Sequence, residues 1–269
     1  MNRSTLIKLI KERGNYLCIG LDTDPAKIPA FLHKESNPVL QFNKAIIDAT
    51  RDLCVSYKIN TAFYEALGKE GWEIMEKTVR YIGTEHFLIA DAKRGDIGNT
   101  SDQYAIAFFD KLPFDAITVN PYMGEDSVKP FLRYKDKWAI VLGLTSNPGA
   151  SDFELQPTGE ELLYQKVLRT VSRWGTNENL MFVIGATRPE QFENIRSMLP
   201  DHFFLVPGLG AQGGDLEKIS QKAMNRDVGI LVNASRAILY VSSSEDFSIK
   251  AREAALGYQK EMSRYLLGP

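Results

Sequence analysis

Four charged side chains follow one apolar segment of the chain, in the run FLIADAKRGDIGNTSDQY that begins at Phe87. Asp91 and Lys93 stand two residues apart, and Arg94 and Asp96 come next. Carboxylates and ammonium groups gathered in one place can keep each other ionised, stabilise a developing charge and transfer a proton. The run therefore predicts electrostatic or acid-base catalysis. The alternatives are a structural Asp91–Lys93 ion pair and solvated loop charges at Arg94 and Asp96.

A second lysine lies inside a β-rich segment. Lys58 stands between Tyr57 and Ile59 in the run SYKIN, and burying a lysine is costly unless it is paired. We therefore expect its partner to be an acid at a neighbouring strand end, such as Asp91. Asp22 ends another apolar run, LCIGLD, where an ordinary loop or helix-capping role is the alternative.

Histidine and cysteine chemistry receive little support. His33 lies in a polar loop, while His86 and His202 stand just before apolar runs, and all three are expected at the surface or at caps. The two cysteines, Cys18 and Cys54, have the pattern of reduced core residues. With no Ser-His-Asp arrangement and no cysteine pair for a metal, any chemistry would use carboxylates and lysines.

The composition describes a globular chain of 269 residues, 44% hydrophobic and 25% charged, which is enough for a large core. The 32 basic and 34 acidic residues nearly cancel, so neither nucleic acid nor an anionic membrane is expected as a partner. The N-terminal segment MNRSTLIKLIKERGNY has charges at helical spacing and no long apolar stretch. It predicts an N-terminal helix rather than a signal peptide or a membrane span, and we expect a cytoplasmic protein.

Eight short apolar, β-rich runs would position the charged residues. The runs end at Asp22, Asn60, Lys93, Tyr122, Ser146, Thr187, Gly210 and Ser235. They lack strict polar alternation, which is typical of strands buried on both faces. Amphipathic stretches of helical length lie between them, among them residues 38–53, 71–83, 159–174 and 188–199. Eight such units favour a closed (β/α)8 TIM barrel, one domain over residues 1–269, rather than an open doubly wound sheet.

The glycine-rich segment PGLGAQGGD follows the seventh run. Its glycines have the spacing of a dinucleotide-binding fingerprint, but the next run ends in NAS at Ser235 and lacks the acid of such a site. In a barrel, the active site lies at the C-terminal ends of the strands, and glycines there can expose backbone N–H groups to an anion. Together with Arg236 after the eighth run, this segment predicts a phosphate site.

The motif D-x-K-x-x-D-I over residues 91–97 resembles the signature of the orotidine 5'-monophosphate decarboxylase family. Other segments agree with this family in order, and they hold Asp22, Lys58, Ser146, Gln212 and Arg236. The resemblance covers most of the chain and is closest to the larger bacterial branch. Arg94 and Gly95 depart from the smaller members, which usually have apolar or small residues there. That departure bears on local packing more than on catalysis.

The resemblance implies decarboxylation of orotidine 5'-phosphate without metal or cofactor. Lys93 would stabilise the carbanion at C6 and then protonate it, and Asp91 would lie near the departing carboxylate. Lys58 and Asp96 would complete an alternating array of charges.

The resemblance also implies a set of binding residues and a homodimer. Asp22 and Thr100 would bind ribose hydroxyls, Ser146 the pyrimidine, and Gln212 with Arg236 the phosphate. The loop that holds Asp96, Ile97 and Thr100 would complete the site of the neighbouring subunit.

Two other readings stay open at the level of sequence. Sugar-phosphate decarboxylases and aldolases on the same scaffold share D-x-K-x-x-D but use Mg2+, and they need a metal-binding acid where this chain has Lys58. A lysine there would repel the ion. A catalytically silent barrel that senses a nucleotide or sugar phosphate is the other reading, and the complete set of charges argues against it.

Overall fold

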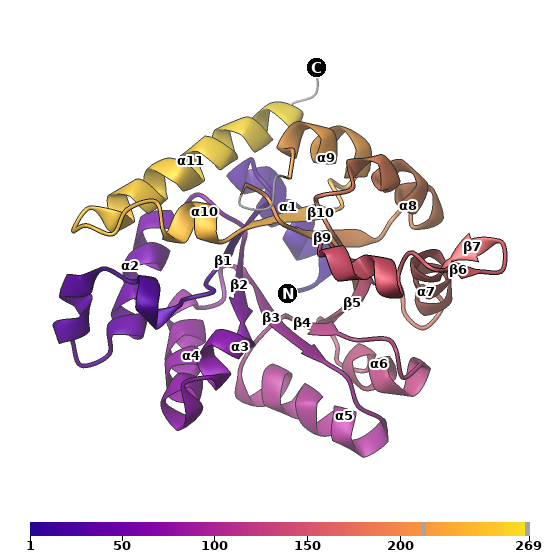
Figure 1. Cartoon of the computed structure of the whole chain (residues 1–269), viewed down its shortest axis with the longest axis horizontal. Helices are drawn as coiled ribbons and strands as arrows, with labels where there is room; N and C mark the ends of the chain where they lie inside the picture. The colour runs from indigo at the N-terminus through magenta and orange to yellow at the C-terminus, as the bar shows by residue number, and fades with distance from the viewer. Residues whose placement is uncertain (211–213, 267–269) are drawn as a thin grey trace.

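The computed structural model of the protein describes residues 1–210 and 214–266. In these residues, eight parallel strands close into a barrel in the order β1-β10-β9-β8-β5-β4-β3-β2 (Figure 1). The strands are β1 (Leu17–Gly20), β2 (Ser56–Asn60), β3 (Phe87–Arg94), β4 (Ala116–Val119), β5 (Trp138–Leu144), β8 (Leu180–Ile184), β9 (Phe203–Pro207) and β10 (Ile230–Ala234). The prediction of a (β/α)8 TIM barrel is thereby confirmed.

Helices surround the barrel and link its strands (Figure 1). The α-helices are α1 (Arg3–Arg13), α2 (Pro38–Thr50), α3 (Thr61–Glu65), α4 (Gly68–Ile82), α5 (Gly98–Ala105), α6 (Glu125–Leu132), α7 (Leu163–Val171), α8 (Phe192–Met198), α9 (Leu216–Ala223), α10 (Arg236–Leu239) and α11 (Phe247–Leu266). Short 3-10 turns lie at Pro25–Lys27, Ala30–Lys34, Pro148–Asp152 and Pro189–Gln191, and a π-helical turn, Ile106–Lys111, extends α5. None of the helices in the described ranges is long and apolar enough to cross a membrane.

The ends of the expected N-terminal helix follow from its sequence. The Asn2 side chain accepts a hydrogen bond from the backbone N–H of Thr5, which caps the first turn of α1. The helix ends at Gly14, whose φ of 61° is a left-handed conformation that glycine adopts without strain.

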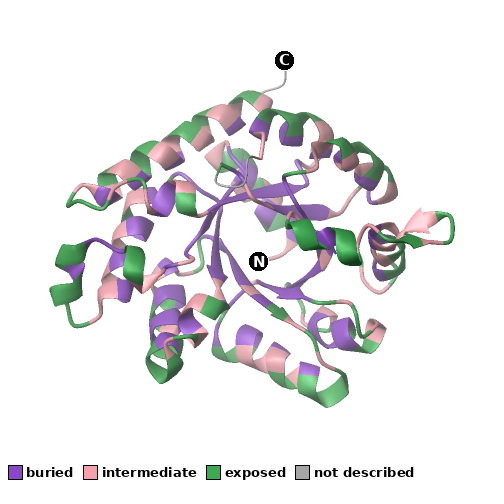
Figure 2. Ribbon diagram, in the orientation of Figure 1, coloured by how far each residue is buried: buried purple, intermediate pink, exposed green. Residues whose placement is uncertain are grey.

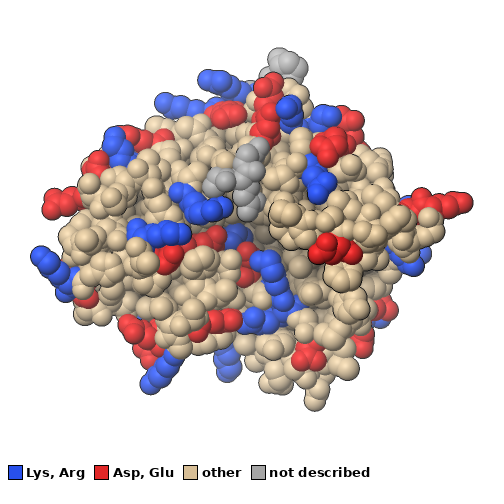
Figure 3. All heavy atoms as spheres, in the orientation of Figure 1, with Lys and Arg blue, Asp and Glu red and all other residues tan. Residues whose placement is uncertain are grey.

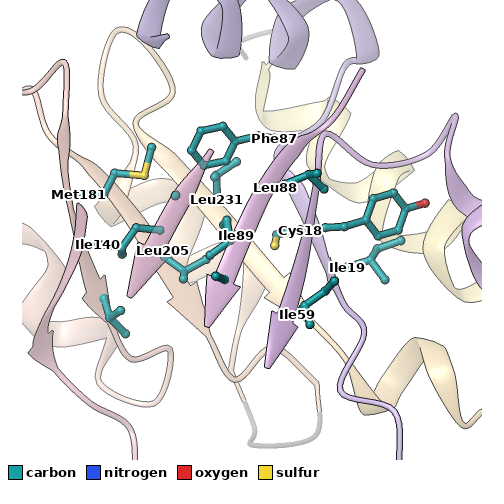
Figure 4. Close-up of a cluster of buried hydrophobic side chains, with 14 of the residues drawn as sticks. Cys18, Ile19, Ile59, Phe87, Leu88, Ile89, Ile140, Met181, Leu205 and Leu231 are labelled. Carbon is teal, nitrogen blue, oxygen red and sulfur yellow. The ribbon is translucent and has the colours of Figure 1, made fainter. Parts of the chain in front are cut away.

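The core fills the barrel and the layer between its strands and the helices. Figure 2 shows the strands buried, while the outward faces of the helices are exposed. The side chains labelled in Figure 4 come from β1, β2, β3, β5, β8, β9 and β10, so one apolar cluster ties together strands from all around the barrel. Each large aliphatic or aromatic side chain buried in this way contributes roughly 1.5–3 kcal/mol to folding. The cluster fills the barrel beneath the C-terminal ends of its strands.

Two predicted helices are shorter than expected. In place of a helix over residues 159–174, the structure has a hairpin of β6 (Pro157–Thr158) and β7 (Glu161–Leu162), followed by α7. Gly159 has a φ of 74° in the turn of this hairpin, which a helix cannot include. In the second case, residues 189–191 form a 3-10 turn before α8.

Most of the predicted strand runs extend too far at their C-terminal ends. The ladders of β1 and β5, for example, stop at Gly20 and Leu144, before the polar residues Asp22 and Ser146. These polar residues leave the sheet because they turn into the mouth of the barrel.

His86 does not lie at the surface, which was one of the two kinds of position expected for it. Its side chain is buried just before β3, and its Nε2 lies 2.6 Å from Arg13 Nη1 and 2.8 Å from the carbonyl oxygen of Arg51. Burial, together with the nearby Arg13 guanidinium, lowers the pKa of His86 to about 4, so the imidazole is neutral at pH 7. His33 is exposed, as expected. Cys18 and Cys54 are free and buried, which confirms their assignment to the core.

Candidate active site

A cavity of about 330 Å³ opens at the C-terminal ends of the strands. Among the residues that line it are Asp22, Lys58, Asp91, Lys93, Ser146 and Arg236. Figure 3 shows basic and acidic side chains together around this hollow in the centre of the molecule's face. The volume is in the range of small-molecule sites. The fold thus gathers, at one mouth, side chains that are more than 200 residues apart in the chain.

Lys58 is the most deeply buried charge of this cavity, with only 3% of the residue exposed. Its Nζ lies 3.0 Å from Asp22 Oδ1 and 3.1 Å from Asp91 Oδ2, which confirms the expected pairing with Asp91 and adds a second acid. Burial opposes the ammonium, but the two carboxylates outweigh it and raise the pKa of Lys58 above its ordinary value. The lysine is therefore charged in the interior.

Asp91 connects the two lysines. Its Oδ1 lies 2.6 Å from Lys93 Nζ, while its Oδ2 accepts the hydrogen bond from Lys58. Burial would raise the pKa of the carboxyl, but the ammonium groups of Lys58 and Lys93 outweigh it and hold that pKa well below its usual range. Asp91 is thus ionised at any physiological pH, and Lys93, whose side chain is about half exposed, points into the cavity beside it.

A bulge in β3 sets the direction of Lys93. The β3–β4 ladder pairs Ala90 with Ile117 and then Arg94 with Val119, so residues 91–93 of β3 face a single residue, Thr118, of β4. Lys93 has a φ of 46°, which non-glycine residues seldom adopt. Bulges of this kind turn side chains at sheet ends toward active sites. Asp91 and Lys93, which stand two residues apart, therefore meet at a bulge and not within a regular stretch of the β3–β4 ladder.

The loop after β1 is fixed on both sides of Asp22. The backbone N–H of Leu21 donates to the carbonyl of Lys58, and the hydroxyl of Tyr240 donates to the carbonyl of Asp22 at 3.1 Å. The same hydroxyl accepts a hydrogen bond from the N–H of Asp24 at 2.8 Å. Tyr240 comes from the far end of the chain, so closure of the barrel is what positions the Asp22 carboxylate.

The opposite side of the cavity carries Ser146 and Arg236. A Cβ added at Gly185 would lie 2.7 Å from the backbone nitrogen of Ser146, so only glycine lets the strand end approach this closely. Arg236 begins α10, is exposed, and makes no ion pair with any residue in the described part of the chain. Gln212 lies outside the described residues.

The structure does not bring Asp96, Ile97 and Thr100 to the cavity of their own chain. Asp96 Oδ1 accepts a hydrogen bond from the backbone N–H of Ile97 at 2.8 Å, and none of the three lines the cavity. The Ile97 side chain is 52% exposed. In their own chain, these three residues therefore do not contribute to the cavity that Lys93 lines.

Sequence reasoning missed Thr118, and it placed Asn233 at a strand end beside the mouth without giving it a role. Thr118 is fully buried, donates to Asp91 Oδ1 at 3.1 Å and accepts a hydrogen bond from the backbone N–H of Lys93 at 2.9 Å. Asn233 is also buried and lines the cavity, and its Oδ1 accepts no hydrogen bond from the described residues. The available signal for Thr118 was a polar residue within the apolar run AITV. Which residues of the neighbouring strand it would contact depends on the strand register, which the sequence does not show.

No group of three His, Cys, Asp or Glu side chains within residues 1–210 and 214–266 is arranged to hold a metal ion. Between Asp22 and Asp91, the position that a cation could take is filled by Lys58 Nζ.

Comparison with known proteins identifies the class to which this barrel and its site belong. Residues 15–246 match the family described as orotidine 5'-phosphate decarboxylase / HUMPS family. The chain is 53% identical to orotidine 5'-phosphate decarboxylase of Parabacteroides distasonis over 270 residues, which is 99% of this chain and 96% of the relative. The chain belongs to this family, and its class of enzyme is decarboxylase.

Solved structures agree with the sequence relatives. The structure of Leishmania donovani OMP decarboxylase superimposes with a TM-score of 0.87 at 33% identity, with all of both chains covered. The enzyme from Methanocaldococcus jannaschii, solved in complex with the inhibitor BMP, gives a TM-score of 0.66 at 25% identity, covering 90% of this chain and 97% of that one.

Proposed function

We propose that the protein decarboxylates orotidine 5'-phosphate to UMP, the last step of pyrimidine nucleotide synthesis, without metal or cofactor. The observation that carries this proposal is the continuous chain of alternating charges Asp22–Lys58–Asp91–Lys93, with contacts of 3.0, 3.1 and 2.6 Å at the cavity. Family membership and the relatives' names support the reaction.

In the proposed mechanism, the bond between C6 and the carboxylate breaks, CO2 leaves, and the electron pair stays on C6. The ammonium of Lys93 stabilises this carbanion and then gives it a proton, which Lys93 regains from water. Asp91 lies near the departing carboxylate and keeps Lys93 oriented. The buried ammonium of Lys58 balances the negative charges of Asp91 and Asp22, so that the Asp91 carboxylate can stay ionised at the reacting centre.

The binding roles are assigned around this centre. We place the ribose hydroxyls at Asp22, the pyrimidine at Ser146 and the phosphate at Arg236, with Gln212 as a further phosphate ligand. Phosphate binding far from C6 can lower the barrier by supplying remote binding energy for closure of the site.

The function is tested by mixing the purified protein with orotidine 5'-phosphate and following loss of the orotate ultraviolet band. We expect rapid loss with release of UMP. Tight binding of UMP without any turnover would instead support a silent sensor. Absence of both turnover and UMP binding would favour a sugar phosphate as substrate.

Replacement of Arg236 should separate phosphate binding from chemistry. For Arg236→Ala we expect the Kd for UMP to rise about 100-fold, because charge-assisted hydrogen bonds to the phosphate are lost. Affinity for uridine, which has no phosphate, should stay within about twofold of the wild-type value. Isothermal titration of both ligands checks this, with Arg226→Ala, an exposed arginine at the other end of the barrel, as control. An unchanged Kd for UMP would exclude the assigned phosphate site.

We further propose that the protein acts as a homodimer in which Asp96, Ile97 and Thr100 complete the partner's site. Support comes from the position of this loop, whose three residues do not line their own cavity, and from exposed apolar side chains close to Gly95 in space, Tyr122 at 89% and Met123 at 45%. Exposed apolar groups of this size favour contact with another protein surface.

Mixed dimers give a direct test of the shared site. Lys93→Ala and Asp96→Ala proteins should each be nearly inactive, but after subunit exchange the mixture should regain about one quarter of wild-type activity, because half of the dimers then hold one intact site. In the control, Lys93→Ala is mixed with Lys58→Met. Both changes lie in the same site of their own chain, so no activity should return. Equal recovery in the two mixtures would rule out sharing of Asp96.

The cellular location that we propose is the cytoplasm. The two free cysteines, both buried, suit a reducing compartment.

A further inference from the structure

The fully buried side chain of Thr118 makes two hydrogen bonds that meet at the centre of the charge array. Its hydroxyl donates to Asp91 Oδ1 at 3.1 Å and accepts the backbone N–H of Lys93 at 2.9 Å. Asp91 Oδ1 is the same oxygen that lies 2.6 Å from Lys93 Nζ. One hydroxyl thus contacts the carboxylate and also the backbone of the lysine which that carboxylate orients.

The backbone at this point needs external support. The φ of 46° at Lys93 is unfavourable for a lysine, and such conformations persist only when the surrounding structure determines them. The bulge also takes residues 91–93 out of the regular ladder with β4, so the N–H of Lys93 is not paired with a β4 backbone carbonyl there. Thr118 is the one residue of β4 across from the bulge, and its hydroxyl accepts a hydrogen bond from that N–H.

A second anchor follows directly after the lysine. The Arg94 guanidinium forms an ion pair with Glu65 at the end of α3 and lies 5.3 Å from the ring centre of Tyr104 and 5.4 Å from that of Phe108. The backbone of Arg94 rejoins the ladder, where its carbonyl accepts the N–H of Asn120 at 2.8 Å. Lys93 is therefore held between the Thr118 hydroxyl on one side and a fixed strand end on the other.

We propose that Thr118 is a positioning residue for the reaction: its hydroxyl fixes the left-handed turn at Lys93 and the Asp91 carboxylate together, so that the ammonium is aimed at the reacting carbon. This inference rests on the proposed function. It assigns Thr118 no contact with substrate, since Thr118 does not line the cavity and acts through Asp91 and Lys93.

Thr118→Val tests the inference because valine keeps the shape and the strand preference of threonine and removes only the hydroxyl. We expect kcat per UMP-titrated site to fall about 10- to 100-fold, in line with loss of hydrogen bonds to a charged group and to its neighbour. The Kd for UMP should change by less than about twofold, because the ligand-binding groups stay in place. Thr118→Ser, which restores the hydroxyl, should recover kcat to within about threefold of wild type.

The possible outcomes distinguish failure of the proposed function from failure of the proposed role of Thr118. Wild-type protein that fails to decarboxylate orotidine 5'-phosphate removes the proposed function, and this inference with it. Active wild type with full kcat in Thr118→Val overturns the inference alone. So does a serine variant as slow as the valine variant, or a valine variant whose Kd for UMP rises as much as its kcat falls, because the hydroxyl would then not be acting through Lys93.

Discussion

Lys93→Ala should lose at least about four decades of turnover, because the change removes the charge next to the carbanion and also the general acid. Lys93 Nζ contacts Asp91 at 2.6 Å, and its side chain is half exposed at the cavity, so its loss creates no hole in the core. The fold and the thermal transition should therefore remain close to wild type. Turnover is measured by the orotate band under saturating substrate.

A matched control for this change is Lys129→Ala. Lys129 is a similarly exposed lysine, 52% accessible, in an i,i+4 ion pair with Glu125 on α6. We expect wild-type turnover from it, since exposed pairs of this kind contribute little. Retention of most activity by Lys93→Ala would remove the proposed role of that residue.

Lys58→Met should combine a large loss of activity with a large loss of stability. The side chain is buried between Asp22 and Asp91, and removing its charge leaves the two carboxylates close together without the cation that they share. Breaking a buried pair in this way costs about 3–5 kcal/mol of unfolding free energy. Turnover should fall by roughly three decades, because Asp91 can then take up a proton and no longer orients Lys93. Urea unfolding and the turnover assay measure the two effects.

The double variant Lys58→Met/Asp22→Asn distinguishes repulsion from simple loss of packing. Removing one of the two carboxylates should recover a substantial part of the stability lost in Lys58→Met, since it relieves the repulsion, but should not recover turnover. If the double variant is as unstable as the single one, repulsion between the carboxylates is not the cause.

The order and number of strands could be predicted from the sequence because each strand of a parallel barrel is a short apolar run separated from the next by an amphipathic stretch. That the charges would be paired was also predictable, because a charge such as Lys58 inside an apolar run must have a partner. Its pairing with Asp91 followed from the rule that neighbouring strand ends meet, and the contact is present.

Features that depend on register or on long-range closure could not be predicted in this way. The bulge in β3 gives no signal in the letters DAKR, yet it creates the role of Thr118. Anchoring of Asp22 by Tyr240 joins residues 218 positions apart, and burial of His86 under Arg13 depends on how α1 packs below the barrel. Sequence patterns report which face a residue prefers, but not which distant side chain will cover it.

The measurement that tests the central claim most directly is decarboxylation of orotidine 5'-phosphate by chelator-treated protein, with and without added Mg2+, beside chelator-treated Lys93→Ala. If the array of Asp22, Lys58, Asp91 and Lys93 carries the reaction, the chelated wild type will turn over at the same rate in both conditions and the variant in neither. A wild-type rate that depends on Mg2+, or a Lys93→Ala rate equal to that of wild type, would contradict this claim.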